Sequence, residues 1–428
     1  MRFEAGERFR ERNHRDCPPQ TEALRPKLSR RFVERVQDAL LWLLGFSGSV
    51  VFIEPSPYEA TFLVAVAGFL LTGGLAFHRS IVVLLLTVVT FKLGGLFSLM
   101  PFLDDTTAVT FVAVSAYLGV TSLFFSYLMT QRPIERLNAL KSGLIWAAVL
   151  ASTAGILGYF NVGGLGEHLT RYGRASGTFK DPNVLGTFVI LPLVFLGQDL
   201  LLRRGSLLKN AALLILILFG GVFLSFSRGA WAHAVLSLVL LLALTFIFTP
   251  SRGLRARIVL IAIAGTVALA LAFIAALSID SVRELYEARA GLSQDYDLGE
   301  TGRFGNQLRS INELVELPNG FGPLRFRLHF PEDPHNVYVN AFASYGWLGG
   351  FSYLLLILAT VFVGWKTVVA RLSVQPYAVA IWSTLFVEIL QGFQIDTDHW
   401  RHFWLMLGLI WGLFGLAQAH RRVGLTHP

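Results

Sequence analysis

The chain has 428 residues, of which 54% are hydrophobic and 15% are charged, whereas about 25% of the residues of soluble domains are charged. This composition excludes an ordinary soluble domain and predicts an all-α integral membrane protein. The formal net charge of +8 is of a kind that nucleic-acid-binding proteins also have, so the placement of the charges matters more than their total.

The first 36 residues are polar and basic. They contain neither the apolar core nor the small-residue cleavage site of a secretory signal, and we expect residues 1–36 to form a cytoplasmic tail. Cys17 is the only cysteine of the sequence, which excludes an internal disulfide and a cysteine-based metal cluster.

Twelve apolar segments follow, and each is close to the length of about 20 residues that a membrane-spanning helix needs. We expect residues 37–419 to form one domain of about 12 transmembrane helices with both termini in the cytoplasm, and residues 420–428 to form a second tail. The segments lie near 37–53, 60–77, 80–98, 107–128, 142–160, 182–200, 210–227, 229–249, 257–278, 335–364, 376–394 and 403–419.

The charged residues are distributed unequally between the two sides that this arrangement defines. The inner segments hold 24 of the 36 Lys and Arg, and the outer segments hold 11 of these but 18 of the 28 Asp and Glu. This is the positive-inside pattern of proteins in a lipid bilayer. It accounts for the net charge, so we expect no nucleic-acid partner.

Two connections on the outer side are longer than plain connectors. They are residues 161–180 and 279–334. In the second, Leu and Ile recur at helical spacing over 303–317, and Pro and Gly follow at 318–323. This pattern predicts short amphipathic helices on the outer membrane surface, joined by turns.

Several basic residues on the outer side have no role in setting the topology and need another explanation. Each alone is compatible with contact to lipid phosphates or with ordinary surface charge. Together they indicate an anion site, because guanidinium groups bind pyrophosphate through paired hydrogen bonds. They are Arg174 and Lys180, just before a helix start at Asp181-Pro182-Asn183, Arg228 in the turn 225–231, and Arg303 in the glycine-containing stretch 299–308.

His335 begins the tenth apolar segment, at the predicted boundary between water and lipid. An imidazole with an ordinary pKa near ~6.5 can accept a proton at neutral pH, although a helix-capping or interface histidine is equally compatible with this position. Asn336 and Asn340 follow it four residues apart, which places them on one face of a helix. Small residues at 341–350 predict close approach of a neighbouring helix.

Further polar residues lie in the last outer loop and within two helices. The segment 394–402 contains two Asp and two His residues, for which a hydrated loop with charge pairs is a simpler explanation than a metal site, and contact with an acceptor sugar is an alternative. Lys92 and Glu388 lie at comparable depth in the third and eleventh segments, so we expect them to pair across the bundle.

A base beside several guanidinium groups at the outer face suits one type of reaction. Pyrophosphate is a good leaving group once its charge is neutralised, so its displacement from a sugar carbon needs electrostatic help. The attacking hydroxyl needs a general base. The sequence therefore predicts chemistry on a membrane-held pyrophosphate.

The sequence resembles the O-antigen ligase and polysaccharide polymerase superfamily of bacterial envelope glycosyltransferases over roughly residues 170–350. The most specific piece is the spacing of His335-Asn336, nine residues, Gly346, two residues and Gly349. The other matching pieces are the segment from Arg174 to Asn183, Ser227-Arg228-Gly229, Gly302-Arg303 and the segment 318–323.

The resemblance implies an inverting transfer of a glycan from an undecaprenyl-pyrophosphate carrier to an acceptor hydroxyl, with no metal and no cofactor. The active site would face the periplasm from the bacterial inner membrane. His335 would be the base, and Arg228 and Arg303 would bind the pyrophosphate. Arg174, Lys180 and Asn183 match family positions with less defined roles, and Asn336 and Asn340 would support the substrate or the structure.

Three classes of function remain open at this point: a glycan transferase, which is either a ligase or a polymerase, a transporter or flippase, and a structural scaffold. The acceptor of a ligase would be the lipid A-core oligosaccharide, whereas a polymerase would extend lipid-linked repeats. A transporter or flippase of polysaccharide or lipid also has about twelve helices, but its binding residues lie near the midplane of the membrane. A structural scaffold would not depend on His335.

Overall fold

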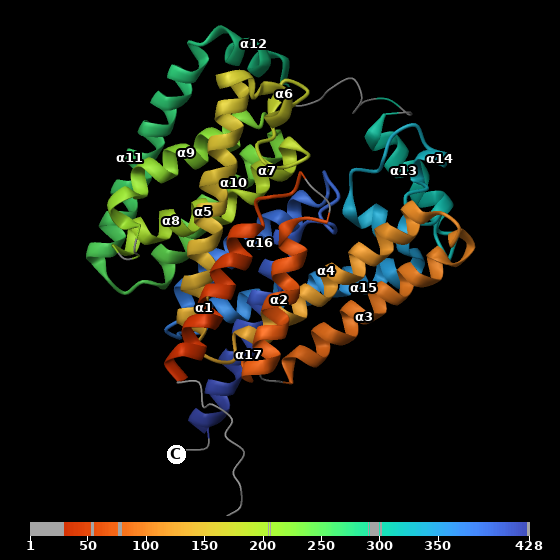
Figure 1. The fold of residues 1–428 in the computed structure, drawn as a ribbon, viewed down its shortest axis with the longest axis horizontal. Helices are drawn as coiled ribbons and strands as arrows, with labels where there is room; N and C mark the ends of the chain where they lie inside the picture. The colour runs from red at the N-terminus through yellow and green to blue at the C-terminus, as the bar shows by residue number, and fades with distance from the viewer. Residues whose placement is uncertain are drawn as a thin grey trace, which may run out of the picture.

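The computed structural model describes residues 30–52, 55–75, 79–203, 205, 207–289, 291, 299 and 302–425. Most of these residues are helical (Figure 1), and the sheet in this part of the chain consists of β1 (Thr170–Arg171) and β2 (Arg174–Ala175), paired antiparallel. Most of the predicted tail at 1–36, including Cys17, lies outside the described residues. Its last seven residues form the first turns of α1 (Arg30–Ser47).

Each of the twelve predicted segments coincides with a helix. Hydrophobic side chains continue around most of these helices, as expected where lipid and protein neighbours are both apolar, whereas α1 begins with charged residues and is amphipathic. The helices are α1, α2 (Pro57–Thr72), α3 (Ser80–Leu99), α4 (Thr106–Leu128), α5 (Pro133–Tyr159), α7 (Pro182–Phe188) with α8 (Ile190–Leu202), α9 (Ala211–Leu224), α10 (Arg228–Phe248), α11 (Arg252–Leu277), α15 (Val337–Val368), α16 (Gln375–Gln391) and α17 (Arg401–Leu425).

Eight of the helical stretches in the described residues are long and apolar enough to cross a membrane. The helix α2 and the stretch Leu208–Leu224 are apolar but shorter. The chain is thus an all-α protein with the helices of a membrane protein, and the count of twelve spans and the cytoplasmic termini stay predictions. The spanning stretches are Ile81–Phe102, Thr106–Leu128, Pro133–Tyr159, Pro182–Leu202, Arg228–Phe248, Arg252–Leu277, Val337–Val368 and Arg401–Arg421.

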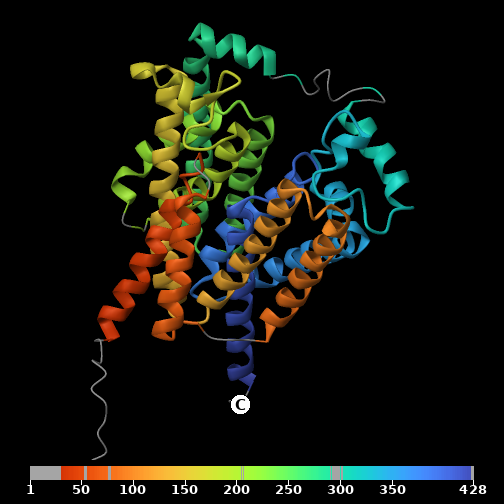
Figure 2. The same cartoon turned by 45° about the vertical axis from the view of Figure 1, so that its right-hand side comes forward.

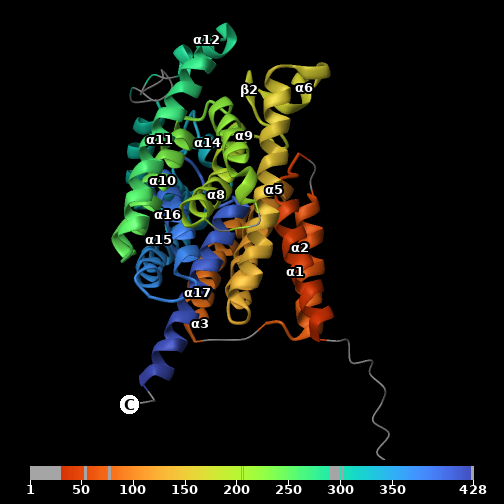
Figure 3. The same cartoon turned by 90° about the vertical axis from the view of Figure 1, so that its left-hand side faces the viewer.

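The two ends of the bundle differ. One end, which we call the loop end, carries α6 (Gly166–Leu169) and α12 (Asp280–Arg289), and α13 (Arg303–Leu314) and α14 (Phe326–His329) lie toward it. The start of α1 and the C-terminal end of α17 lie at the opposite end, as Figure 2 and Figure 3 show from two further sides. The predicted short helices of the long connection at 279–334 are therefore present as α12, α13 and α14.

The helix α13 is amphipathic, as predicted. Its polar residues Asn306 and Ser310 are buried, and an apolar stripe at Phe304, Leu308 and Ile311 is exposed. An exposed apolar stripe on a short helix is typical of a helix that lies in a membrane surface.

The helix α15 is broken at Gly346. This residue has φ +64° and ψ −171°, a conformation that is essentially restricted to glycine. The backbone groups released by the break are bound by the turn that precedes α14: Pro318 O accepts Trp347 N–H at 2.8 Å, and Ala343 O accepts Phe321 N–H at 2.9 Å. The sequence did not predict this break.

Beyond the break, α15 packs tightly on α3. A Cβ atom added to Gly94 would lie 2.4 Å from the backbone nitrogen of Gly349, so the two backbones touch where both residues lack a side chain. The predicted close approach of a neighbouring helix at 341–350 is confirmed, and α3 is that neighbour.

Gly346→Ala is expected to lower the free energy of unfolding by about 2–4 kcal/mol, because alanine is strained in this conformation and its Cβ would overpack the site. That Cβ would lie 2.6 Å from Pro318 O. Equilibrium unfolding in mixed detergent micelles measures the effect. Gly265→Ala in α11 is the matched control, since a Cβ there meets nothing within 4 Å, and equal stabilities of the two variants would contradict the account.

The helices differ in how much protein surrounds them. For α7 and α8, 83% of the most apolar window is buried inside the protein, whereas the corresponding share for α11 is 6%. The helix α11 therefore lies at the periphery with nearly all of its surface available to lipid.

Candidate functional site

His335 lies in a short turn directly before α15. It has φ +42° and its side chain is partly exposed. Gln307 of α13 holds both neighbours of this residue: its Nε2 donates to Pro334 O at 2.6 Å, and its Oε1 accepts Asn336 Nδ2 at 3.3 Å. The sequence analysis did not single out Gln307, although it lies in the glycine-containing stretch that contains Arg303.

Asn336 is the N-cap of α15. Its Oδ1 accepts the backbone N–H groups of Tyr338 at 3.0 Å and Val339 at 3.3 Å, which is the usual role of asparagine at a helix start. Helix capping is thus performed by Asn336 and not by His335. Asn340 has a different partner, since its Oδ1 accepts the Ser344 hydroxyl at 2.8 Å, so the two asparagines do not act as a pair.

The start of α15 is also fixed to the end of α16. Val337 N–H donates to Gly392 O at 2.8 Å, and the Tyr338 hydroxyl donates to Ile389 O at 2.6 Å. These bonds join the turn that carries His335 to a second helix.

Arg303 begins α13 and lies near His335. Burial lowers the pKa of the His335 imidazole, and the positive charge of Arg303 lowers it further. Both effects favour the neutral ring, which is the form that can accept a proton. The structure therefore brings together the predicted base and one of the predicted anion ligands.

The last outer loop reaches the same turn. Burial raises the pKa of the Asp396 carboxyl well above its ordinary value, the neighbouring Asp398 raises it further, and a hydrogen bond from the Asn336 backbone and the charge of Arg303 act in the opposite direction.

This last outer loop was predicted to be hydrated and to contain charge pairs. The charge pairs are confirmed, since Arg401 pairs with Glu59 and His399 with Asp398. The hydration is wrong for two of its residues: Asp398 is 1% exposed and His402 is 6% exposed.

A second cluster surrounds Arg174. Its Nε donates to Ser225 O at 2.7 Å, and its NH2 donates to Asn183 Oδ1 at 2.8 Å. The predicted helix start is confirmed, because Asp181 caps α7 by accepting Asn183 N–H at 2.6 Å. Arg174 is buried and ties three segments together, so a large part of its hydrogen-bonding capacity is directed at the protein.

Arg228 and Lys180 lie at the loop end near this cluster. Arg228 is the first residue of α10, and its NH1 donates to Gly291 O at 2.6 Å. Lys180 is exposed in the segment between β2 and α7, and its backbone oxygen accepts NH1 of Arg171 at 2.8 Å.

The end of α16 lies between Arg228 and His335. A Cβ at Gly229 would be 2.8 Å from Gln391 Nε2, so the first turn of α10 packs on Gln391, and the next residue, Gly392, binds the start of α15. Arg228 and His335 thus flank the same helix end, whereas Arg303 is near enough to His335 for its charge to lower the pKa of the imidazole.

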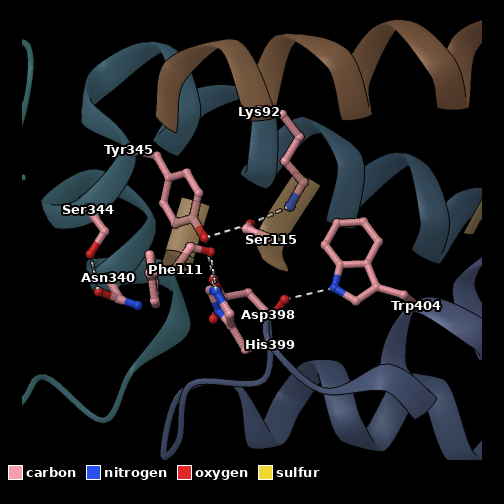
Figure 4. Close-up of polar contacts among 9 residues, drawn as sticks. All are labelled: Lys92, Phe111, Ser115, Asn340, Ser344, Tyr345, Asp398, His399 and Trp404. Carbon is pink, nitrogen blue, oxygen red and sulfur yellow. Dashed lines mark hydrogen bonds and ion pairs between the residues drawn. The ribbon is translucent and has the colours of Figure 1, made fainter. Parts of the chain in front are cut away.

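A buried polar network runs beneath this region (Figure 4). Lys92 Nζ donates to Ser115 Oγ at 2.7 Å, Ser115 Oγ and the Tyr345 hydroxyl are 2.7 Å apart, and that hydroxyl donates to Asp398 Oδ2 at 3.0 Å. His399 Nδ1 lies 3.1 Å from the same carboxylate oxygen. Burial favours the neutral acid, but His399 and Lys92 nevertheless lower the pKa of Asp398.

The prediction that Lys92 pairs with Glu388 across the bundle is wrong. Lys92 is connected to Asp398 through two hydroxyl groups, and Glu388 Oε1 lies 3.1 Å from Nε2 of His402. Lys92 and Glu388 therefore each lie close to a residue in or next to the segment 394–402, and not to each other.

Within the residues that the structure describes, no group of three or more His, Cys, Asp and Glu residues has an arrangement that could hold a metal ion. No family model matches the chain, and no curated protein matches it either. The likeness to the ligase and polymerase superfamily therefore rests on the motif residues alone.

Proposed function

We propose that the protein is a membrane glycosyltransferase of the O-antigen ligase type. It transfers a glycan from an undecaprenyl-pyrophosphate carrier to an acceptor hydroxyl. The observation that carries the proposal is the placement of His335 beside Arg303 at the start of α15, where burial and the arginine both lower the pKa of the imidazole.

In the proposed reaction, neutral His335 takes the proton of the acceptor hydroxyl as its oxygen attacks the anomeric carbon of the donor sugar. The bond between that carbon and the pyrophosphate oxygen breaks, and its electron pair leaves with the carrier pyrophosphate. Arg303 and Arg228 stabilise the negative charge that develops on the leaving group. Attack from the face opposite the leaving group inverts the configuration of the anomeric carbon.

The proposal places the loop end at the periplasmic face of a bacterial inner membrane. The carrier would reach the site from the bilayer, and the acceptor from the aqueous side. The lipid A-core oligosaccharide is the acceptor in the ligase form of the proposal, and a lipid-linked repeat is the acceptor in the polymerase form.

Transport is the second candidate function, because a broken helix and buried ionisable residues are typical of transporters. The break in α15 and the buried Lys92 and Asp398 favour it. Against it, the part of α15 after the break has 22 residues, Trp347–Val368, and is about 33 Å long, enough to span the hydrocarbon core alone. The break then lies at the loop end of the span.

The test is to incubate the purified protein with an undecaprenyl-pyrophosphate-linked repeat from its host, with and without lipid A-core, and to resolve the products by size. Lengthened carrier-linked chains without added acceptor identify a polymerase. Glycan on lipid A-core identifies a ligase. If neither product forms, while the same protein in sealed vesicles moves the carrier-linked repeat across the membrane, the transferase proposal fails.

A further inference from the structure

A cavity whose lining does not include His335 lies near the loop end. It has a volume of about 250 Å³ and is lined by residues from the end of α1, α2, α4, α7 and the start of α17. We call it the aromatic pocket and define it by Tyr117, Phe179, Phe188, Trp400, Glu59 and Arg401. The proposed transfer reaction uses none of these residues.

Flat rings form much of its wall. Phe179 and Phe188 lie with their ring centroids 5.1 Å apart, and Trp400 stacks on His402 at 5.3 Å. Stacked and tilted rings of this kind offer rigid apolar faces to a ligand. A ligand of this pocket therefore needs at least one flat apolar face.

The charged residues of the pocket neutralise each other. Arg401 Nε donates to Glu59 Oε1 at 2.9 Å, and the Ser56 hydroxyl donates to Glu59 Oε2 at 2.6 Å. A phosphate or carboxylate ligand would have to compete with Glu59 for the guanidinium group of Arg401. The pocket therefore suits a ligand without net charge.

The wall at the start of α17 is held in place from outside the pocket. His399 lies between Asp398, at 3.1 Å, and Phe111 O, at 3.2 Å from its Nε2, and Asp398 is in turn bound by Tyr345 (Figure 4). Such support by a buried network keeps the shape of the pocket defined before any ligand binds.

Two buried polar atoms in the lining of the pocket lack a hydrogen-bond partner among the described residues, the hydroxyl oxygen of Tyr117 and Nε2 of His402. Nε2 of His402 lies 3.1 Å from Glu388 Oε1, which leaves the hydroxyl of Tyr117 as the atom that needs a partner. A buried hydroxyl without a partner is unfavourable, and in native proteins such groups usually find one. The Tyr117 hydroxyl therefore calls for a ligand that can both donate and accept a hydrogen bond.

We infer that the aromatic pocket binds a single neutral sugar ring. The C–H face of a pyranose packs on aromatic rings, and its hydroxyl groups can bind the hydroxyl of Tyr117. A lipid acyl chain would leave that hydroxyl and the ion pair of Glu59 and Arg401 facing hydrocarbon. The inference rests on the proposed function in one respect: we assign the bound sugar to the acceptor glycan. Binding of the sugar does not itself require the transfer reaction.

The test measures binding of methyl β-glucoside, methyl β-galactoside and methyl N-acetyl-β-glucosaminide to the full chain in phosphatidylcholine nanodiscs by saturation-transfer NMR. These discs avoid detergents with sugar head groups, which would compete. At least one glycoside is expected to bind in the millimolar range. Tyr117→Phe is expected to weaken its binding about tenfold, the equivalent of one hydrogen bond, while Tyr172→Phe, at an exposed tyrosine of the same end, leaves it unchanged.

Two results would overturn the inference: no saturation transfer from any of the three glycosides at tens of millimolar, or equal binding by wild type and Tyr117→Phe. Lipids brominated in the acyl chain test the other occupant. Other tryptophans, such as Trp365, are exposed, so both proteins are quenched, and only quenching that is clearly larger in wild type than in Trp400→Phe would place an acyl chain in the pocket. If no glycoside binds but the protein still transfers glycan, the inference of a sugar site is refuted and the proposed function stands. If a glycoside binds but no glycan is transferred, the proposed function is refuted and the sugar site stands.

Discussion

Replacement of His335 by alanine is expected to reduce the rate of glycan transfer by about 10²- to 10⁴-fold, the range that a general base contributes. The variant loses the proton acceptor while Asn336 still caps α15 and Gln307 still binds Pro334, so its stability should stay close to that of the wild type. Single-turnover rates with the carrier-linked donor in excess measure the effect.

The matched control is His329→Ala. His329 lies in α14, six residues before His335, and is exposed, with its ring stacked on Phe321. Its removal should leave the rate within a few-fold of wild type. His335→Asn adds a second check, because asparagine tolerates the positive φ of this position but cannot accept the proton. Transfer at the wild-type rate by either His335 variant would rule out this residue as the base.

The pH dependence of the transfer rate should also show that His335 acts as a general base. A general base works in its neutral form, so the rate rises with pH through the pKa of His335 and then levels off. Because that pKa is lowered by burial and by Arg303, the midpoint of the rise should lie at a lower pH than the pKa of an ordinary histidine. Arg327 also lowers the pKa and Asp333 raises it. Arg327→Gln should therefore move the rise to higher pH and Asp333→Asn to lower pH, most clearly at low salt.

Asp398→Ala is expected to cost about 3–5 kcal/mol of unfolding free energy, the cost of removing one partner of a buried charge pair. The variant leaves Lys92, 8% exposed, without its carboxylate and removes the acceptor of the Tyr345 hydroxyl. Unfolding by SDS in mixed micelles measures the loss. Asp280→Ala is the control, since its ion pair with Arg283 is exposed and exposed pairs contribute about 0–1 kcal/mol.

A double-mutant cycle separates the network from simple loss of packing. Lys92→Met removes the cation but keeps the apolar stem, so Lys92→Met with Asp398→Asn should be more stable than the sum of the two single effects predicts. Additive effects would mean that Lys92 and Asp398 do not act on each other through Ser115 and Tyr345.

The helices of this fold could be predicted from sequence because lipid imposes a simple rule on them: a span must be apolar, about 20 residues long and bonded within itself. The amphipathic helix α13 could be predicted from the helical spacing of its Leu and Ile residues. The break in α15 could not be predicted, because the run from Val337 to Val368 is mostly apolar and has the length of one long span. What makes the break possible is a turn at Pro318, whose position against Gly346 depends on the folded chain.

The candidate site was predicted in part. His335 and Arg303 could be found because each is a polar residue without a topological role. Asp396 and Asp398 were assigned to a hydrated loop, since a short segment with several charges usually is one. The burial of Asp398 depends on Tyr345 and Lys92, and Asp396 lies near Asn336, all from distant parts of the chain. A lysine inside a span needs a polar partner, so a partner for Lys92 could be predicted. The predicted partner, Glu388, lies in a helix, whereas the observed one, Asp398, lies in a loop.

The exposed position of α11 has a consequence for how the protein can evolve. Lipid tails adapt to any apolar shape, so exchanging one aliphatic residue for another along α11 opens no cavity and creates no clash, in contrast to a packed core. At the crossing of α3 and α15, any side chain added to Gly94 meets the backbone of Gly349. Homologues are therefore expected to diverge freely in the sequence of α11 and to retain glycine, or change both positions together, at that crossing.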